Sequence, residues 1–511
     1  MTNSESSKRI AKNTAMLYIR MLLTMAISLY TARIVLNTLG VEDFGIYNVV
    51  GGFVTMFGFL NLAMASATQR FLSFEIGKKD LKQLKNVFSM SVNIHFIIAF
   101  VVLIFAETVG LWFVNTQLTI PADRIIAAKW VYQFSILVLM VNMVSVPYNA
   151  IIIAHERMNV FAWVSIAEVS LKLLLVFMLV WFGFDKLKLY AVLMFGVALI
   201  IRLIYGFYCS RNFKESKFRF FWDKPLFKIL MSYAGWNLWG NAAGVIMGQG
   251  VNLLLNIFFG PLVNAARGIA YQVQSAVNSF VVNFQMAMNP QIIKSFAADD
   301  IKYMHQLIYQ GAKYSYFLLF ALSLPILLET EIILKIWLKI VPEYTVIFTQ
   351  LVIINVLIDS VSGPLMTAAQ ASGKIKLYQG VVGGLFLLIL PFSYLFLKFD
   401  YQPQITLYVS IAISIIALLV RLYIVSPLIN LSIIKFVRNV LVRIVLVACA
   451  AVIFPLTIKL SIETESIRIF AVCIISVISV AISSYLLGLS MDEKLFIKNK
   501  IWIYIIKLSK R

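Results

Sequence analysis

Charged residues are scarce in this chain of 511 residues. Asp, Glu, Lys and Arg together make up 13% of the sequence, whereas hydrophobic residues make up 61%. A soluble domain usually carries charge on about a quarter of its residues, so this composition excludes a sizeable soluble domain. Acidic residues are the scarcer sign, with 23 of them against 44 basic residues.

Residues that build disulfides, metal sites and nucleotide sites are also few. The three cysteines, Cys209, Cys449 and Cys473, all lie in apolar stretches, so we expect no disulfide framework. The three histidines are far apart in the sequence and indicate no metal site. A Gly-x-x-x-x-Gly-Lys-[Ser/Thr] phosphate loop is absent, which excludes ATP hydrolysis through that motif. We therefore expect no cofactor and no enzymatic activity.

Long apolar runs fill most of the chain. Runs of about twenty apolar residues recur some fourteen times, and this length is typical of a helix that spans a bilayer. They predict an all-α polytopic membrane protein with about 14 transmembrane helices. The predicted spans are Thr14–Leu36, Gly45–Phe71, Val87–Phe113, Ile125–Val146, Val160–Phe182, Leu189–Cys209, Ile229–Ile257, Leu262–Ile293, Tyr314–Leu328, Tyr344–Ala368, Leu377–Phe396, Ile405–Val425, Val437–Ile458 and Ile469–Leu487.

Basic residues in the gaps between spans predict the orientation. Alternate gaps form two sets, which hold 28 and eight basic residues. Lys and Arg accumulate in cytoplasmic loops, so the richer set and both termini are predicted to be cytoplasmic. In a soluble protein the net charge of +21 would suggest nucleic acid. Here the cations stand at helix ends, so we predict anionic membrane lipid as their partner and no nucleic acid.

A faint internal repeat has a spacing of about 220 residues. The matching positions are Gln69, Ser73 and Phe74 with Gln291, Ser295 and Phe296; Asp80 and Lys82 with Asp300 and Lys302; and Pro147, Ala154, Arg157 and Phe161 with Pro364, Ala371, Lys374 and Tyr378. The offset covers six spans, an even number, so the halves would run in the same direction about a pseudo-twofold axis along the membrane normal. We predict six-helix lobes at residues 1–218 and 219–430, with an appended hairpin and a basic cytoplasmic tail at 431–511.

The arrangement of six plus six plus two spans resembles the multidrug/oligosaccharidyl-lipid/polysaccharide (MOP) exporter superfamily. The segment Ala32–Tyr47, which contains Arg33, a Leu39-Gly40 pair and a Phe44-Gly45 pair, is similar to the first-helix signature of its polysaccharide branch. The resemblance implies a flippase of a bacterial inner membrane. Its substrate would be an undecaprenyl-diphosphate-linked oligosaccharide, an O-antigen or capsular repeat unit, moved from the inner to the outer leaflet by alternating access. A polysaccharide polymerase and glycosyltransferases would be its protein partners.

Polar residues on two neighbouring spans indicate where a substrate would bind. Arg267, Tyr271, Gln274, Asn278, Gln285 and Asn289 share one face of the eighth span, and Asn237, Asn241, Gly244, Gly248 and Asn252 share one face of the seventh. Such a stripe either lines a watery cavity or forms a hydrogen-bonded helix seam. The arginine favours a cavity for the eighth span, whereas both alternatives stay open for the seventh. We predict substrate binding by Arg267, Gln274, Asn278 and Asn241.

Two arginines in the first span are further candidates for substrate binding. Arg20 is a candidate because of its depth within the span, and Arg33 because it belongs to the family signature. A diphosphate carries about two negative charges, and arginine offers charged, bidentate donors at any physiological pH. The two side chains point about 220° apart on an ideal helix, so both face one cavity only if the helix bends or the cavity wraps around it.

Other charged residues within the spans are expected to pair, to couple transport to an ion or to reach the lipid headgroups. Glu168 and Lys172 stand four residues apart, as in a helical ion pair, and either neutralise each other or act as a protonation switch. Asp359 has no sequence-local partner, which makes it a candidate for proton or sodium coupling. Three basic residues near span ends are expected to extend to the lipid headgroups; they are Arg70, Lys129 and Arg421.

Two rival functions are compatible with a polytopic chain. A drug or cation antiporter of the same fold should favour acids in its cavity. Arg438 and Arg443, at the start of the thirteenth span, are counted with the gap before it, and the spans then hold eight basic residues against three acids. A membrane-embedded glycosyltransferase or polymerase usually needs a long external loop that carries acids or arginines. The gaps predicted to be external are all short, so this alternative is weaker.

Overall fold

The computed structural model describes residues 3–116, 121–181, 185–259, 261–338, 341–491 and 493–495. Within these ranges the regular structure is helical throughout, and eleven segments are long and apolar enough to cross a membrane. The predicted all-helical membrane fold is confirmed.

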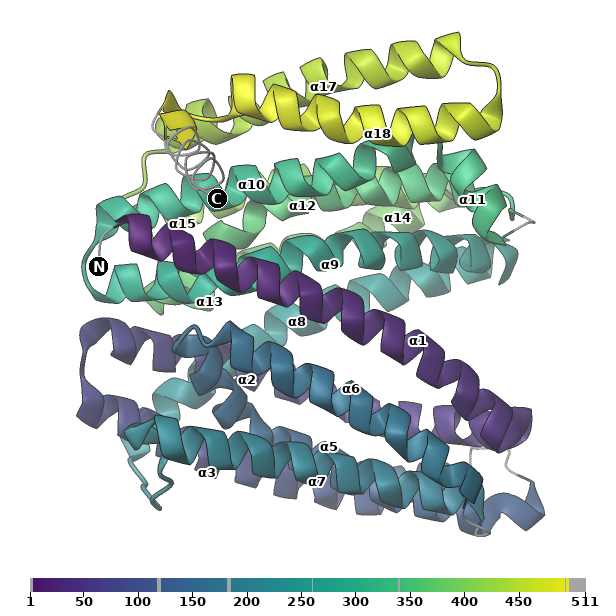
Figure 1. Ribbon diagram of the computed structural model, residues 1–511, viewed down its shortest axis with the longest axis vertical. Helices are drawn as coiled ribbons and strands as arrows, with labels where there is room; N and C mark the ends of the chain where they lie inside the picture. Colours follow the sequence, from purple (N-terminus) through teal and green to yellow (C-terminus); the bar gives the residue numbers. More distant parts are fainter. Residues whose placement is uncertain are drawn as a thin grey trace, which may run out of the picture. The chain divides into compact units, whose positions relative to one another are not determined.

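The helices are long and follow one another with short connections (Figure 1). Their bounds are α1 (Asn3–Thr55), α2 (Phe59–Lys78), α3 (Leu81–Phe105), α4 (Leu111–Thr116), α5 (Ile125–Ala154), α6 (Met158–Trp181), α7 (Lys186–Asn212), α8 (Lys224–Phe259), α9 (Pro261–Ala297), α10 (Ile301–Leu328), α11 (Thr330–Leu338), α12 (Thr345–Ser372), α13 (Ile375–Leu387), α14 (Ile389–Lys398), α15 (Ile405–Leu428), α16 (Ile433–Phe436), α17 (Val442–Ser461) and α18 (Glu465–Ser483).

Gly40 interrupts α1 between the first two predicted spans. Its φ of 81° and ψ of 167° are not helical, and glycine adopts such a positive φ without the steric cost that a Cβ brings. Helical backbone leads up to Gly40 from one side and resumes on the other. The Leu-Gly pair of the sequence signature therefore marks the point where the first span ends and the second begins.

The chain forms two compact units. Unit 1 comprises Met1–Ala242 and Met286–Ile301, and unit 2 comprises Ala243–Gln285 and Lys302–Arg511. The division falls inside α8 and α9, whereas the predicted lobes divide at residue 218. Those lobe boundaries and the separate hairpin domain stay predictions.

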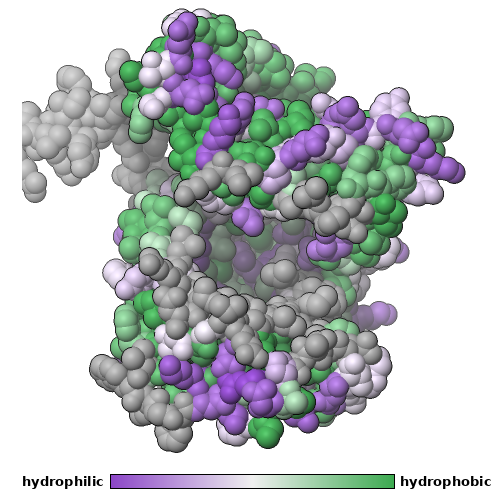
Figure 2. Space-filling model, turned by 90° about the vertical axis from the view of Figure 1, so that its right-hand side faces the viewer, coloured by the Kyte–Doolittle hydropathy of each residue, from purple (hydrophilic) through white to green (hydrophobic). Residues whose placement is uncertain are grey.

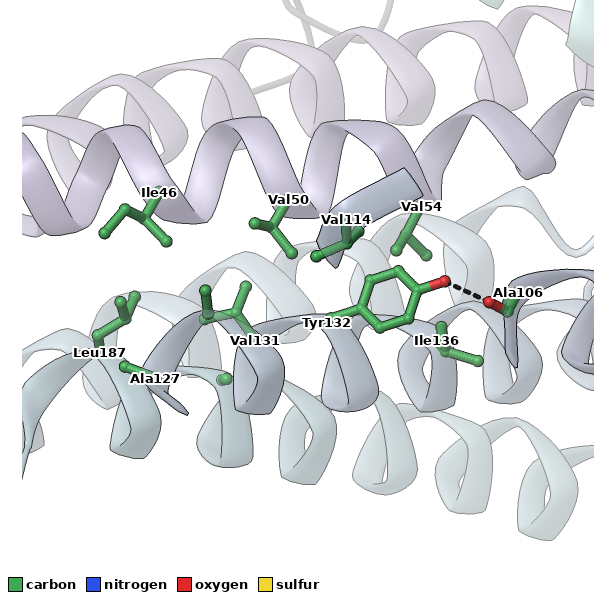
Figure 3. Packing of buried hydrophobic residues seen from close by; sticks show 12 residues of the cluster. Ile46, Val50, Val54, Ala106, Val114, Ala127, Val131, Tyr132, Ile136 and Leu187 are labelled. Atoms are coloured by element: carbon green, nitrogen blue, oxygen red, sulfur yellow. Dashed lines mark hydrogen bonds between the residues drawn. The ribbon is translucent and has the colours of Figure 1, made fainter. Parts of the chain in front are cut away.

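In unit 1, one apolar cluster joins α1, α5 and α7. Figure 3 shows Val50 and Val54 of α1 directed toward Val131 and Tyr132 of α5. The Tyr132 hydroxyl donates to the carbonyl oxygen of Ala106 at 2.6 Å. The ring can thus be fully buried, because its one polar group has a partner.

In unit 2, α17 and α18 form an antiparallel hairpin (Figure 1). The Ser479 hydroxyl joins the two helices by donating to the carbonyl of Ala451 at 2.8 Å. A buried ion pair also ties the chain after α18 to α10, because Lys313 Nζ lies 2.8 Å from the carboxylate of Glu493. The hairpin is therefore held to its neighbours by polar contacts as well as by apolar ones.

The backbone supports the internal repeat. Lys79 and Asp299, which are 220 residues apart, end α2 and α9 with φ of 60° and 57°. The amide after each donates five residues back, from Asp80 to Glu75 and from Asp300 to Ser295. The same turn therefore closes both helices at the spacing that the sequence predicts.

Exposed side chains along the helices are largely apolar. Phe100, Trp163 and Leu203 are among the large hydrophobic residues that are more than half exposed. Figure 2 looks along the helices, and hydrophilic residues gather on the helix ends while hydrophobic ones cover the flanks. Apolar flanks of this kind suit contact with lipid tails.

Candidate functional site

Arg267 lies in unit 2, on α9, and is held against α8. Its side chain is buried, and Nη2 donates to the carbonyl of Gly248 at 3.1 Å while Nη1 donates to Asn252 Oδ1 at 3.5 Å. The guanidinium also lies over the ring of Tyr271, 4.3 Å from its centroid. Arg267 thus has a defined position, and part of its hydrogen-bonding capacity joins the two helices.

The rest of the stripe on α9 divides into two environments. Gln274 and Asn278 are half-buried. Gln285 fills a notch at Gly363, where an added Cβ would lie 2.3 Å from its amide oxygen, and it donates to the hydroxyl of Ser315 at 3.0 Å. Gln285 therefore belongs to a helix seam. For Gln274 and Asn278, a place in the wall of a substrate cavity stays a prediction.

Asn241 lies on α8 in the part that belongs to unit 1, whereas Arg267, Gln274 and Asn278 belong to unit 2. The Asn241 side chain is exposed. Its role in substrate binding stays a prediction.

Arg20 lies in unit 1 with its guanidinium 4.7 Å from the ring centroid of Phe161 on α6. The Arg33 side chain lies outside the described residues. The non-helical residue of α1 is Gly40, which follows both arginines. Within α1 the backbone therefore shows no break between them that would turn both side chains toward one side.

The predicted pair on α6 is confirmed as an ion pair. Lys172 Nζ lies 2.6 Å from Glu168 Oε1, and 34% and 38% of the two side chains are exposed. An ion pair with this exposure can form as a local helical contact. The distance does not distinguish between simple neutralisation and a protonation switch.

The expectation for Arg421 was wrong. The side chain does not extend away from the bundle but is buried, with Nη1 3.7 Å from Asp359 Oδ1 and the guanidinium 5.2 Å from the Phe386 centroid. Asn355 also donates to Asp359 Oδ2 at 3.2 Å. A charge within an apolar span is costly unless it is paired, so packing of α12 on α15 brings the two together.

Arg70 corrects the same expectation in unit 1, while Lys129 agrees with it. The Arg70 side chain is buried between aromatic rings, with the guanidinium 4.5 Å from the centroids of both Phe71 and Phe74. Cation–π contact compensates part of the cost of burying it. Lys129 is exposed, as a headgroup-directed side chain would be.

A further charged cluster was missed because its members are far apart in sequence. Arg124 Nε donates to Asp43 Oδ1 at 2.8 Å, and Nη1 donates to Asp185 Oδ2 at 3.1 Å. Asp185 also accepts from the first amides of α7. The contact joins three helix ends of unit 1, and its one sequence signal was an isolated arginine in a gap with few basic residues.

The helical architecture is shared with solved structures of membrane transporters. A MATE-family multidrug resistance transporter of the MOP superfamily in its outward-facing conformation is similar with a TM-score of 0.69 and 12% identity, over 83% of this chain and 96% of that one. A MATE transporter of Vibrio cholerae in its bent form has a TM-score of 0.66 and 16% identity, over 84% and 98% of the chains. The chain therefore has the same fold as these transporters.

A third similar structure and the sequence comparisons complete the assignment. A MOP-superfamily transporter of Pyrococcus furiosus, whose binding pocket is described as having reverse polarity, has a TM-score of 0.67 and 13% identity over 83% and 96% of the chains. No curated protein matches the sequence. Residues 10–296, more than half of the chain, match the family described as polysaccharide biosynthesis protein. The chain belongs to this family.

Proposed function

We propose that the protein flips an undecaprenyl-diphosphate-linked oligosaccharide, an O-antigen or capsular repeat unit, by alternating access. The observation that carries this proposal is membership of the polysaccharide biosynthesis family together with the MOP fold. The substrate enters from the inner leaflet of a bacterial inner membrane and leaves in the outer leaflet. Both termini are cytoplasmic, in agreement with the 28 basic residues of the richer set of gaps.

Cations within the spans favour an anionic headgroup as the cargo. Arg20, Arg33 and Arg267 are the arginines that we propose to contact the diphosphate, with Asn241, Gln274 and Asn278 as neutral hydrogen-bonding partners. Arginine holds its charge at any physiological pH and binds phosphate through paired donors. The contacts of Arg267 with Gly248 and Asn252 support a fixed orientation for one of these groups. Binding needs no covalent step, because flipping changes only the leaflet of the headgroup.

Energy coupling is assigned to the acids. Asp359, paired with Arg421 at 3.7 Å, is the main candidate, and the Glu168–Lys172 pair is the second. Protonation of Asp359 would cancel its attraction to Arg421, whereas the arginine cannot lose its charge. A proton gradient could therefore switch this contact without any change in the cationic groups that bind substrate.

The experiment is transport in proteoliposomes that contain the purified chain. A fluorescent lipid-linked oligosaccharide is placed in one leaflet, and its arrival in the other is followed by an impermeant quencher. We expect transport above protein-free vesicles and competition by unlabelled undecaprenyl diphosphate. Absence of both would contradict the proposal.

A multidrug antiporter is the second candidate, because solved structures of the same fold include a multidrug resistance transporter. Gradient-driven extrusion of organic cations by the same proteoliposomes, without transport of the lipid-linked sugar, would favour it. The eight basic residues against three acids in the predicted spans argue for the anionic cargo.

A further inference from the structure

The turn between α5 and α6 holds a glutamate in a backbone conformation that favours glycine. Glu156 has a φ of 59°, and its amide donates to the carbonyl of Ile153 at 2.8 Å. The repeat places Gly373 at the equivalent position, with a φ of 74° and an amide that donates to Gln370 at 3.1 Å. Glutamate pays a steric cost at a position that glycine occupies freely. A compensating interaction is therefore expected at the Glu156 side chain.

The Glu156 carboxylate makes that interaction with two other helices. Only 2% of the side chain is exposed, and Gln291 Nε2 donates to Oε2 at 2.5 Å. Arg9 Nη2 lies 3.6 Å from Oε2, and Lys294 Nζ forms an ion pair with Oε1. Asn13 also donates to the Glu156 carbonyl at 3.2 Å. One turn is thus tied to the start of α1 and to the end of α9.

The end of α9 also packs closely on the end of α2. A Cβ added to Gly77 would lie 2.7 Å from the carbonyl oxygen of Lys294 and 2.7 Å from the Cβ of Ala297. Phe74 and Phe296, which correspond in the repeat, have ring centroids 6.5 Å apart. Glycine permits this approach of two backbones, and the residues that bind Glu156 lie on the same turns of α9.

These last turns belong to unit 1, although the first part of α9 belongs to unit 2. We propose that Glu156 is a latch: a positioning residue that fastens the end of α9 and the start of α1 in this arrangement and releases them during transport. The proposal rests on the proposed alternating-access function, in which packed helix ends must separate on one side of the membrane. Hydrogen bonds that share one buried carboxylate strengthen one another, so the shared contact holds the helix ends more firmly than one hydrogen bond would.

The test is the reactivity of a cysteine on α9, next to the residues that contact Glu156. Ser295, on the same turns of α9, is buried, and Ser295→Cys is introduced after Cys209, Cys449 and Cys473 are replaced by serine. The rate of labelling by a charged maleimide is measured in membrane vesicles of both orientations. We expect slow labelling in this parent and at least fivefold faster labelling after Glu156→Gly, from the side where the termini lie. Glycine suits the turn, so the fold is retained while the carboxylate is removed.

Lys79→Gly is the matched control, because Lys79 is exposed and also has a positive φ of 60° in unit 1. It relieves the same backbone strain without touching the latch, so labelling should stay slow. Lys294→Ala should accelerate labelling, whereas Lys294→Arg, which keeps the charge, should restore most of the protection. Glu156→Gln, which keeps the shape of the side chain, provides a second variant if the glycine variant fails to fold.

Equal labelling rates in the parent, Glu156→Gln and Lys294→Ala would overturn the latch, and so would equal acceleration by Lys79→Gly. Labelling needs neither substrate nor transport. Failure of lipid-linked oligosaccharide transport with the expected labelling pattern would therefore contradict the proposed cargo and leave the latch standing. Transport of the lipid-linked oligosaccharide with unchanged labelling would support the proposed cargo and contradict the latch.

Discussion

Two carboxylates, one in each unit, are paired with basic residues in different ways. Glu156 of unit 1 lies in a turn, and its side chain is 2% exposed. It forms ion pairs with Arg9 and Lys294 and accepts a hydrogen bond from the side-chain amide of Gln291. Asp359 of unit 2 lies inside α12, is 34% exposed, and faces Arg421 at 3.7 Å. The more buried carboxylate has more partners, because each lost contact with water must be replaced. Glu156 therefore suits a contact that fastens helix ends together, whereas the role of Asp359 in ion coupling stays a prediction.

The largest effect should follow removal of the cation that faces Asp359. Arg421→Ala is expected to lower the free energy of unfolding by about 3 kcal/mol, the lower end for a broken buried pair, because Asp359 is partly exposed. Lys294→Ala should cost less, about 1–2 kcal/mol, since Arg9 and Gln291 still contact Glu156. Thermal unfolding in nanodiscs compares the two.

The double variant Asp359→Asn with Arg421→Leu is the control, and it should regain most of the stability lost in Arg421→Ala. A larger loss in Lys294→Ala than in Arg421→Ala would reverse the comparison between the two units.

The next effect concerns the other arginine of unit 2. Arg267→Ala should reduce surface polysaccharide at least tenfold at unchanged membrane abundance, because it removes a positioned cation for the diphosphate; tenfold corresponds to about 1.4 kcal/mol. Arg267→Lys should recover part of the export, since lysine keeps the charge but not the planar donors. The control is Lys129→Ala, an exposed cation of unit 1 that should leave export unchanged. Similar export by both alanine variants would contradict a cationic substrate site.

A smaller effect is expected from neutralising the acid alone. Asp359→Asn should still bind substrate, because the proposed substrate contacts lie elsewhere, but transport by the folded variant should no longer respond to an imposed pH gradient. The measurement is flipping in proteoliposomes with and without that gradient. If gradient stimulation persists in both Asp359→Asn and Glu168→Gln, neither acid couples transport to protons.

The smallest effect is expected in the connection between α7 and α8. Burial is the largest single influence on the Glu215 carboxyl and acts to raise its pKa. The hydrogen bond with His155 at 2.6 Å, a backbone hydrogen bond and the charge of His155 together outweigh burial, so the pKa is lowered from its ordinary value. Because the folded pKa is the lower one, the contribution to stability is present above the ordinary pKa and is lost as pH falls through the lowered value. We expect a contribution below about 1 kcal/mol for this partly exposed pair.

Melting temperatures of the parent and Glu215→Gln, measured between pH 6 and pH 3, test this sign. The difference between the two proteins should shrink toward the acid end. A difference that grows as pH falls would contradict it.

Local pattern was enough to predict much of the fold. Apolar length predicted the helices, the Leu39-Gly40 pair marked the break in α1, and the four-residue spacing of Glu168 and Lys172 predicted their ion pair. Each of these features depends on residues within one or two helical turns, and helix geometry alone relates such neighbours.

Partners that are distant in sequence escaped prediction. Arg421 was expected at the headgroups because it stands near the end of its span, yet packing of α12 on α15 directs it to Asp359. Arg70 was expected there too and is buried between rings. Hydropathy reports the distance of a residue from a span end, but it does not report which helix stands beside it.

The sequence by itself determined that this chain is a many-times-crossing helical membrane protein with an internal repeat, since apolar runs, gap charges and recurring motifs are all read along one dimension. Only the tertiary structure decided which charges meet. Glu156 and Lys294 are 138 residues apart, and they meet where the end of α9 lies against the turn between α5 and α6. A buried charge must find its counter-charge in space, and the packing of whole helices determines where that counter-charge lies.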